Sequence, residues 1–266
     1  MFSGFHIGKL FIGTYGIFAL IGIMTAFPIS IHYYKKRTGD DISMILVYLW
    51  AALGVVLGMH LLFGITNISY WGKLLEAKDF LDFLKRFVAI FSGSVFYGGL
   101  LGGLAAGGIA VKRMKLPADT VTDCAAPFIA IMHGFARIGC FFGGCCYGVE
   151  WEHGITFTDS IVKSANGVPR VPIQLFEAGF EFILGGVLWY LLTRSMKTGK
   201  LQGKLLALYL LIYPVGRFIL EFWRGDEYRG FIFGLSTSQF ISVVVFVCAL
   251  GFLIYRQIKP KTKSSE

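Results

Sequence analysis

Two arginines lie inside long apolar stretches of the sequence. Arg137 falls near the end of the stretch 119–142, and Arg217 falls within 205–222. Placing an arginine at the centre of a membrane helix costs about 2.5–3.5 kcal/mol on insertion scales, so intramembrane arginines usually serve a function. The planar, forked guanidinium suits phosphate, and two of them facing each other would bind a phosphodiester. In a membrane the natural phosphodiester is a phospholipid headgroup, which we expect Arg137 and Arg217 to bind.

The spacing around Arg217 adds two further polar groups. Tyr213, Arg217 and Glu221 recur at intervals of four residues, which places a phenol, a guanidinium and a carboxylate on one helical face. A structural alternative pairs Arg217 with Glu221 and lets Arg137 reach the membrane interface. Only one acid, Glu221, is close along the same helix as an arginine. That acid cannot neutralise both guanidinium groups, so the pattern favours a phospholipid site.

The composition indicates an integral membrane protein. Of the 266 residues 55% are apolar and 15% are charged, whereas soluble domains are about 25% charged. The net charge of +9 is scattered in short clusters, which argues against binding to nucleic acid. Stretches of about 20 apolar residues predict transmembrane helices. We expect an all-α polytopic fold, one integral membrane domain over 1–266, with seven such helices: 11–31, 44–65, 87–111, 119–142, 173–192, 205–222 and 235–255.

The basic residues predict the orientation of these helices. Just over half of the lysines and arginines fall in alternate connections, and cytoplasmic loops carry such an excess. We therefore expect the N-terminus outside, the C-terminus in the cytoplasm and an external loop over about 144–172. In this orientation both arginines lie in the outer half of the membrane.

The stretch 87–111 is rich in glycine pairs. Small residues at intervals of four let membrane helices approach closely. Tyr97, Gly98 and Gly99 lie about 15 Å into this stretch, where bare backbone beside a hydroxyl would also suit the lining of a cavity. Close packing of helices explains these glycines, and the same glycines could also line a substrate site.

Several motifs resemble those of bacterial prolipoprotein diacylglyceryl transferases. The signature stretch of that family is similar to GFARIGCF at 134–141, followed by Gly148. Five further matches come in the same order as in the family: YG at 15–16, YGGLLG at 97–102, RVPIQLFE at 170–177, YPVGRFILEFWR at 213–224 and GLSTSQ at 234–239.

The resemblance implies a reaction in the bacterial cytoplasmic (inner) membrane. A diacylglyceryl group moves from phosphatidylglycerol to the lipobox cysteine thiol of a prolipoprotein signal peptide, a thioether forms and glycerol phosphate leaves. Phosphatidylglycerol, the prolipoprotein and the surrounding membrane lipids are then the partners, with no cofactor and no metal. Arg137 and Arg217 match the key arginines of the family, and Tyr15 and Tyr213 match its functional tyrosines. We expect Gly98, Gly99, Gly139, Cys140 and Glu221 to complete the phospholipid site.

The chain departs from the family pattern at three positions. Tyr97 stands where the family often has histidine, Cys140 where it often has asparagine, and Cys145 where it has glutamate. The base that deprotonates the incoming thiol is therefore open between Tyr97 and His133, which shares the helical face of Arg137 and Cys140. The alternative for His133 is a neutral hydrogen-bonding role between helices.

Cysteines cluster at the outer end of the fourth predicted helix. The spacing of Cys140, Cys145 and Cys146 fits no standard zinc pattern. Packing thiols, a disulfide, and a nucleophile or metal ligand are the three alternatives, in that order of preference. Two other functions also stay open: a divergent transferase with another acceptor, and a non-catalytic phospholipid-binding or transport protein. The sequence shows no internal repeat of the kind that transporters often have.

Overall fold

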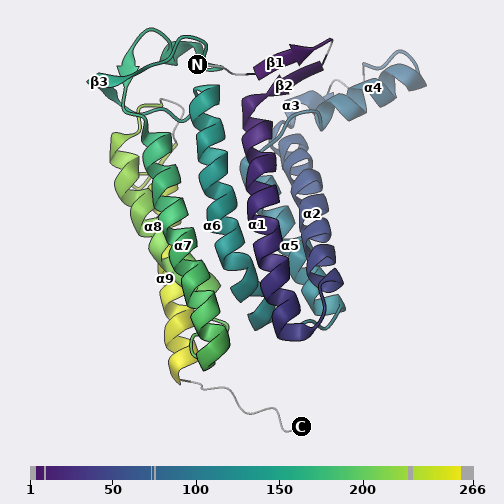
Figure 1. Ribbon diagram of the computed structural model, residues 1–266. Helices are drawn as coiled ribbons and strands as arrows, with labels where there is room; N and C mark the ends of the chain where they lie inside the picture. The colour runs from purple at the N-terminus through teal and green to yellow at the C-terminus, as the bar shows by residue number, and fades with distance from the viewer. Residues whose placement is uncertain (1–3, 9, 73, 75, 227–229, 259–266) are drawn as a thin grey trace. The chain divides into compact units, whose positions relative to one another are not determined.

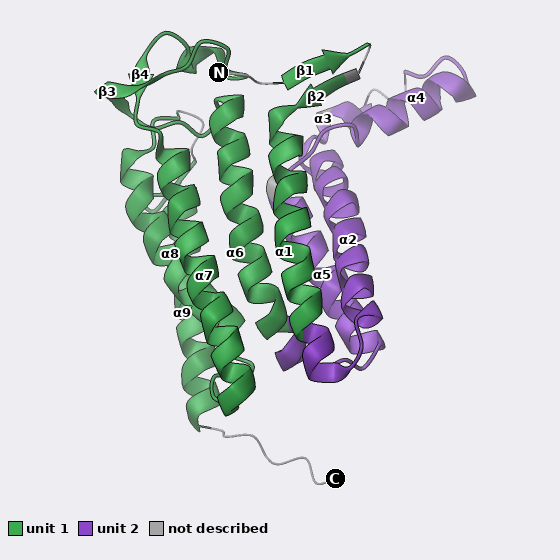
Figure 2. Cartoon of the chain, viewed as in Figure 1, with its two compact units in different colours: residues 1–33, 122–266 green, residues 34–121 purple. Residues whose placement is uncertain are grey.

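The computed structural model describes residues 4–8, 10–72, 74, 76–226 and 230–258, and most of them are helical (Figure 1). The chain forms two compact units, residues 1–33 with 122–266 (unit 1) and residues 34–121 (unit 2) (Figure 2). The helices are α1 (Thr14–Thr38), α2 (Ile42–Thr66), α3 (Ser69–Gly72), α4 (Phe80–Ile90), α5 (Phe96–Arg113), α6 (Ala118–Gly143), α7 (Ile173–Thr198), α8 (Leu205–Leu220) and α9 (Thr237–Ile258), with the short 3-10 helices η1 (Lys163–Ala165) and η2 (Glu221–Trp223).

Three small antiparallel sheets complete the described structure. Each is a pair of strands: β1 (Gly4–Ile7) with β2 (Leu10–Gly13), β3 (Glu150–Thr156) with β4 (Pro169–Arg170), and β5 (Phe231–Ile232) with β6 (Leu235–Ser236). The fold is therefore mostly helical, as the sequence predicts, with short strands between the long helices.

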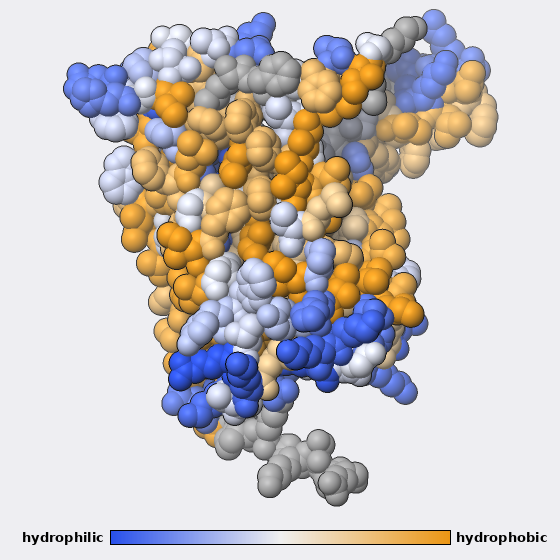
Figure 3. Space-filling model, in the orientation of Figure 1, coloured by the Kyte–Doolittle hydropathy of each residue, from blue (hydrophilic) through white to orange (hydrophobic). Residues whose placement is uncertain are grey.

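Six of the described helices are long and apolar enough to cross a membrane: α1, α2, α6, α7, α9, and α8 continued by η2. Apolar side chains cover the middle of the helices and hydrophilic ones gather near their ends (Figure 3). On α7, for example, Ile183 is 71% exposed. Exposed apolar surface of this kind is stable in lipid, and the prediction of a polytopic membrane protein is confirmed.

The third predicted helix, 87–111, is wrong as a single element. Helix α4 ends at Ile90 and α5 begins at Phe96. Serine and glycine in the intervening segment favour a break over a continuous helix. Helix α2 stabilises this break, because His60 Nδ1 lies 2.8 Å from the Gly93 carbonyl oxygen and the Val95 amide donates to the Met59 carbonyl at 3.1 Å.

In unit 2 the glycines of α5 bring its backbone against α2. A Cβ atom at Gly102 would collide with the carbonyl oxygen of Gly54, and one at Gly98 would collide with that of Gly58. Packing therefore accounts for Gly98, and Gly99 likewise faces Val55.

In unit 1 two glycines bring α7 close to α6 and α8. The ring of Phe182 covers Gly134 of α6, and the ring of Phe180 covers Gly216 of α8. These glycines stand next to His133 and Arg217 in the sequence. The close approach therefore places the polar face of α7 beside both residues.

A buried carboxylate fixes where α8 begins. Asp123 of α6 is fully buried, and it accepts hydrogen bonds from the amides of Gly203 at 2.7 Å and Leu205 at 3.0 Å. Helix N-termini have unpaired amides and a partial positive charge, so an acid there is favourable. Asp123 of α6 supplies the acceptor for these amides at the start of α8. This contact explains why an acidic residue occurs within an apolar stretch.

The loop after α6 forms a small polar head that is tied to the end of α8. Tyr147, Phe157 and Ala165 make its core, and Arg170 stacks on the Tyr147 ring at 4.5 Å. The Val149 amide donates to the Trp223 carbonyl oxygen at 2.9 Å. This tie brings the segment after α6 next to the residues that follow η2.

We predict that Gly102→Ala lowers the stability of unit 2 by about 1–3 kcal/mol, because the added methyl group overpacks the contact of α5 with α2. Gly108→Ala on the same helix is the matched control, since a Cβ there meets nothing within 4 Å and alanine favours helix. Thermal unfolding of the purified protein in detergent measures both. Equal melting temperatures for the two variants would contradict the packing role of Gly102.

Candidate active site

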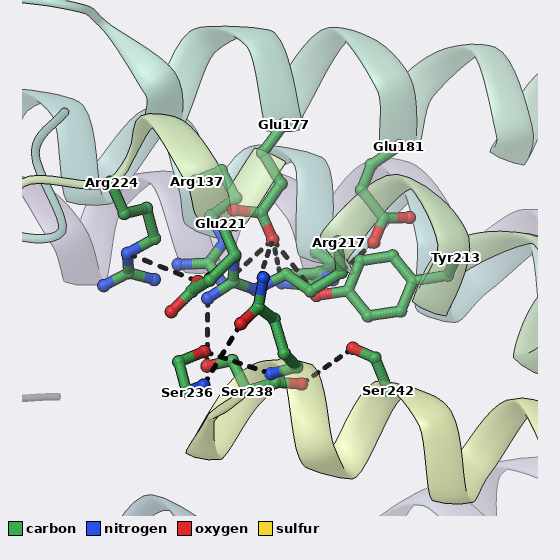
Figure 4. A network of polar contacts seen from close by, with 12 residues as sticks. Arg137, Glu177, Glu181, Tyr213, Arg217, Glu221, Arg224, Ser236, Ser238 and Ser242 are labelled. Atoms are coloured by element: carbon green, nitrogen blue, oxygen red, sulfur yellow. Dashed lines mark hydrogen bonds and ion pairs between the residues drawn. The ribbon is translucent and has the colours of Figure 1, made fainter. Parts of the chain in front are cut away.

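The carboxylate of Glu177 is the meeting point of three helices. Glu177 lies on α7 and is 2% exposed. Its Oε1 lies 3.0 Å from Nη2 of Arg137 on α6 and 3.8 Å from Nε of Arg217 on α8 (Figure 4). The Tyr213 hydroxyl donates to the same oxygen at 3.0 Å. The two arginines that the sequence singles out are thus held by one carboxylate.

A second carboxylate, Glu181, lies one turn further along α7. It is fully buried, its Oε1 lies 2.5 Å from Nδ1 of His133, and the Tyr209 hydroxyl donates to it at 3.1 Å. Nε2 of His133 lies 4.0 Å from Glu177. The hydrogen-bonding role of His133 between helices is therefore observed. In the tautomer in which Nδ1 donates to Glu181, Nε2 is the nitrogen able to accept a proton.

Arg217 makes further contacts on its other side. Its Nη1 lies 2.6 Å from Oε2 of Glu221, so the pairing of these two residues is observed. Its Nη2 donates to the Ser238 hydroxyl of α9 at 3.1 Å. The start of α9 is itself capped: the Ser236 amide donates to Oε1 of Gln239, and the Gln239 amide donates to the Ser236 hydroxyl. The cap fixes Ser238 beside Arg217.

Arg224 extends the network past the end of η2. It is buried, its Nε lies 3.9 Å from Oε2 of Glu221, and it donates two hydrogen bonds to Asp226. Burial lowers the pKa of Arg224, but the hydrogen bonds to Asp226 raise it above its usual value. The side chain therefore keeps its positive charge.

One donor of Arg137 is left over. Its Nε–H is buried and has no hydrogen-bond partner among the residues that the structure describes. A buried donor without a partner is costly, and an anionic ligand would satisfy it. The arrangement can therefore bind an anion between charged groups that are already oriented.

Other residues that the sequence predicts for the site lie next to Arg137. Tyr15 of α1 packs against Gly139, where a Cβ atom would lie 3.0 Å from the Tyr15 Cα. Tyr15 also interacts electrostatically with Arg137 and Cys140. Tyr15, Gly139, Cys140 and Arg137 thus form one cluster in unit 1.

Tyr97, Gly98 and Gly99 belong to α5 of unit 2. Their role in catalysis or in phospholipid binding stays a prediction, as does that of the other residues proposed for the site.

Cys140 in the last turn of α6 and the two cysteines that follow the helix, Cys145 and Cys146, have free thiols, so the alternative of a disulfide is not observed. Hydrogen bonds from Cys140 and Cys145 hold the pKa of Cys146 below its usual value, and Arg224 and Arg137 act in the same direction against burial.

Sequence reasoning missed Glu177 and Glu181. It counted only Glu221 as a partner for the arginines, and the structure corrects this, because two acids of α7 reach Arg137, Arg217 and His133. The available signal was their spacing of four residues inside an apolar stretch, which places two acids on one helical face.

A buried network of arginines and carboxylates, enclosed by helices with apolar outer surfaces, is typical of a multi-pass membrane protein that handles a charged substrate. The family model of prolipoprotein diacylglyceryl transferase matches residues 3–255. The chain belongs to this family.

Curated relatives cover nearly the whole chain. A phosphatidylglycerol–prolipoprotein diacylglyceryl transferase of Clostridium tetani is 33% identical over 94% of this chain and 95% of its own length. Transferase 2 of the same name from Clostridium perfringens is 32% identical over 96% and 95%. The enzyme of Geobacter sulfurreducens is 31% identical over 94% and 93%.

We predict that Glu177→Gln lowers the free energy of unfolding by about 3 kcal/mol or more, because it leaves the buried charge of Arg137 uncompensated. Glu152→Gln is the control, since that side chain is 83% exposed and surface pairs contribute little. Thermal unfolding in detergent is the measurement. A variant as stable as the wild type would show that Glu177 does not hold the arginines together.

Proposed function

We propose that this chain transfers a diacylglyceryl group from phosphatidylglycerol to the cysteine thiol of a prolipoprotein. The observation that carries the proposal is the convergence of Arg137 and Arg217 on Glu177 in a chain of this family. The relatives that match over nearly their whole length are named for this reaction.

The reaction needs positive charge where the phosphate leaves. The thiolate attacks the glycerol carbon of the diacylglyceryl group, a carbon–sulfur bond forms and the bond from that carbon to the phosphate oxygen breaks. Glycerol phosphate departs with the electron pair and gains one more negative charge. Arg137 and Arg217 stabilise this charge through hydrogen bonds that strengthen as the bond breaks. The unpartnered Nε–H of Arg137 is a donor available for it.

The reaction also needs a base for the thiol, whose pKa is near 8.5. We assign this role to His133. Its contact with Glu181 supports a proton on Nδ1 and an accepting Nε2. The proton taken from the thiol then passes to the departing phosphate. Tyr97 is the alternative base.

The basic connections support a location in the bacterial cytoplasmic membrane with the N-terminus outside. In this orientation the network lies in the outer half of the membrane, and the head formed by residues 144–172 faces outward. The head then meets the signal peptide of the prolipoprotein at the membrane surface, while the surrounding lipids supply phosphatidylglycerol.

We predict that Arg137→Lys and Arg137→Gln both lower the transfer rate by about 10²–10³, because lysine keeps the charge but loses the forked geometry. The assay incubates the purified protein with labelled phosphatidylglycerol and a lipobox peptide, and a peptide without its cysteine is the control. Full activity of Arg137→Lys would exclude bidentate phosphate binding by Arg137.

Variants of Arg217 distinguish a role in catalysis from a role in stability. If Arg217 only neutralises Glu221, the double variant Arg217→Gln with Glu221→Gln regains both stability and transfer. We expect the double variant to regain stability and to remain inactive. Thioether formation and thermal unfolding measured on the single and double variants decide between the two roles.

We predict that His133→Gln lowers transfer at neutral pH by about 10²–10⁴, the usual contribution of a general base. The deficit should shrink as the pH rises towards 8.5, because the substrate thiol then ionises without a base. The measurement is the ratio of wild-type to variant rates over this pH range. A ratio that stays constant with pH would refute His133 as the base.

A further inference from the structure

The sulfur atoms of three cysteines meet at the end of α6. Cys140 lies in the last turn of this helix, and Cys145 and Cys146 follow in the loop. Their Sγ atoms all lie within 4.8 Å of one another. Cys140 is buried and the other two are half-buried. The proposed transferase reaction uses none of these thiols as its nucleophile, because the substrate supplies the attacking sulfur.

The loop backbone is folded so that the three thiols converge. Cys146 has a φ of +57°, a left-handed conformation that residues with a side chain rarely adopt. The Cys145 amide donates to the Cys140 carbonyl oxygen at 3.1 Å, and the Gln174 side chain donates to the Cys145 carbonyl oxygen at 2.8 Å. Cys146 therefore has a backbone conformation that glycine adopts more easily than a residue with a side chain.

Two cations lie near the cluster. Arg137 precedes Cys140 by three residues on α6, so the two side chains share a helical face. The positive charge of Arg224 acts on Cys146. Buried charges need partners or a metal ion, and these cations would offset the negative charge of thiolates bound to a metal.

We propose that Cys140, Cys145 and Cys146 form a three-thiolate binding site for a thiophilic metal ion. Thiolate sulfur selects Zn²⁺ and Cu⁺ over Mg²⁺ and Ca²⁺. Zinc–sulfur bonds of about 2.3 Å in a tetrahedral site hold the sulfurs about 3.8 Å apart, so the observed cluster needs only a small contraction. The thiols release their protons to the solvent when the metal binds, and the fourth position is left to another ligand.

The sequence alone predicts no metal here, because paired Cys-x-x-Cys spacing is absent. The structure replaces that pattern with one ligand from the end of a helix and two from the turn that follows it. Cys124 and Cys248, which lie elsewhere in the chain, do not belong to the cluster.

The test uses the full chain, purified in detergent and reduced. Metal binding is measured by titration with Zn²⁺ and, independently, with Cd²⁺, whose bonds to thiolate absorb in the ultraviolet. We expect one ion per chain, together with a rise in melting temperature on addition of Zn²⁺, since a ligand bound to the folded state stabilises it. In Cys145→Ser and in Cys146→Ser the affinity for Zn²⁺ should fall by about a hundredfold or more. Loss of a group that only hydrogen-bonds to a metal ligand already lowers the affinity by up to about a hundredfold.

Cys248→Ser is the matched control, because this exposed cysteine on α9 should leave both readouts unchanged. The melting temperatures without metal show whether each variant is folded. Absence of binding by the reduced wild type would overturn the proposal, as would unchanged binding by a folded Cys146→Ser variant. A disulfide within the cluster in place of a metal, in protein isolated from cells, would also overturn it.

Discussion

The buried carboxylate of Glu177 is the interaction on which the arrangement of unit 1 depends. It contacts Arg137 from α6 and both Arg217 and Tyr213 from α8, and so it joins three helices at one oxygen. Removing one partner from a buried ion pair leaves an uncompensated charge, which costs far more than the pair contributes. The helices therefore have to pack closely enough for all of these contacts to form at once. Gly134 and Gly216 permit this, because the rings of Phe182 and Phe180 fit against their bare backbone.

Much of the helical architecture could be predicted from hydropathy alone, since a long apolar stretch has few alternatives in lipid. The break between α4 and α5 was missed because apolar residues flank it on both sides, and the contacts that stabilise it come from His60 and Met59 of another helix. Arg137 and Arg217 stood out as charges in apolar stretches. Glu177 and Glu181 were missed although they lie four residues apart, because their partners lie on α6 and α8, far from them along the chain.

The arginines take their partners from several elements. Glu177 lies on α7, Glu221 on η2 and Ser238 on α9. The polar network is thus distributed over five helical segments, α6, α7, α8, η2 and α9, rather than centred on the stretch 134–141.

The carboxylates that hold the arginines also bear on the proposed reaction. Before substrate binds, they keep Arg137 and Arg217 charged and oriented, so little reorganisation is needed when phosphate arrives. A phosphodiester carries a single negative charge and competes with Glu177 and Glu221 on nearly equal terms. The departing glycerol phosphate gains a second charge and competes better. The guanidinium groups would then bind the leaving group more strongly than the intact lipid, which is the difference in binding that accelerates the chemical step.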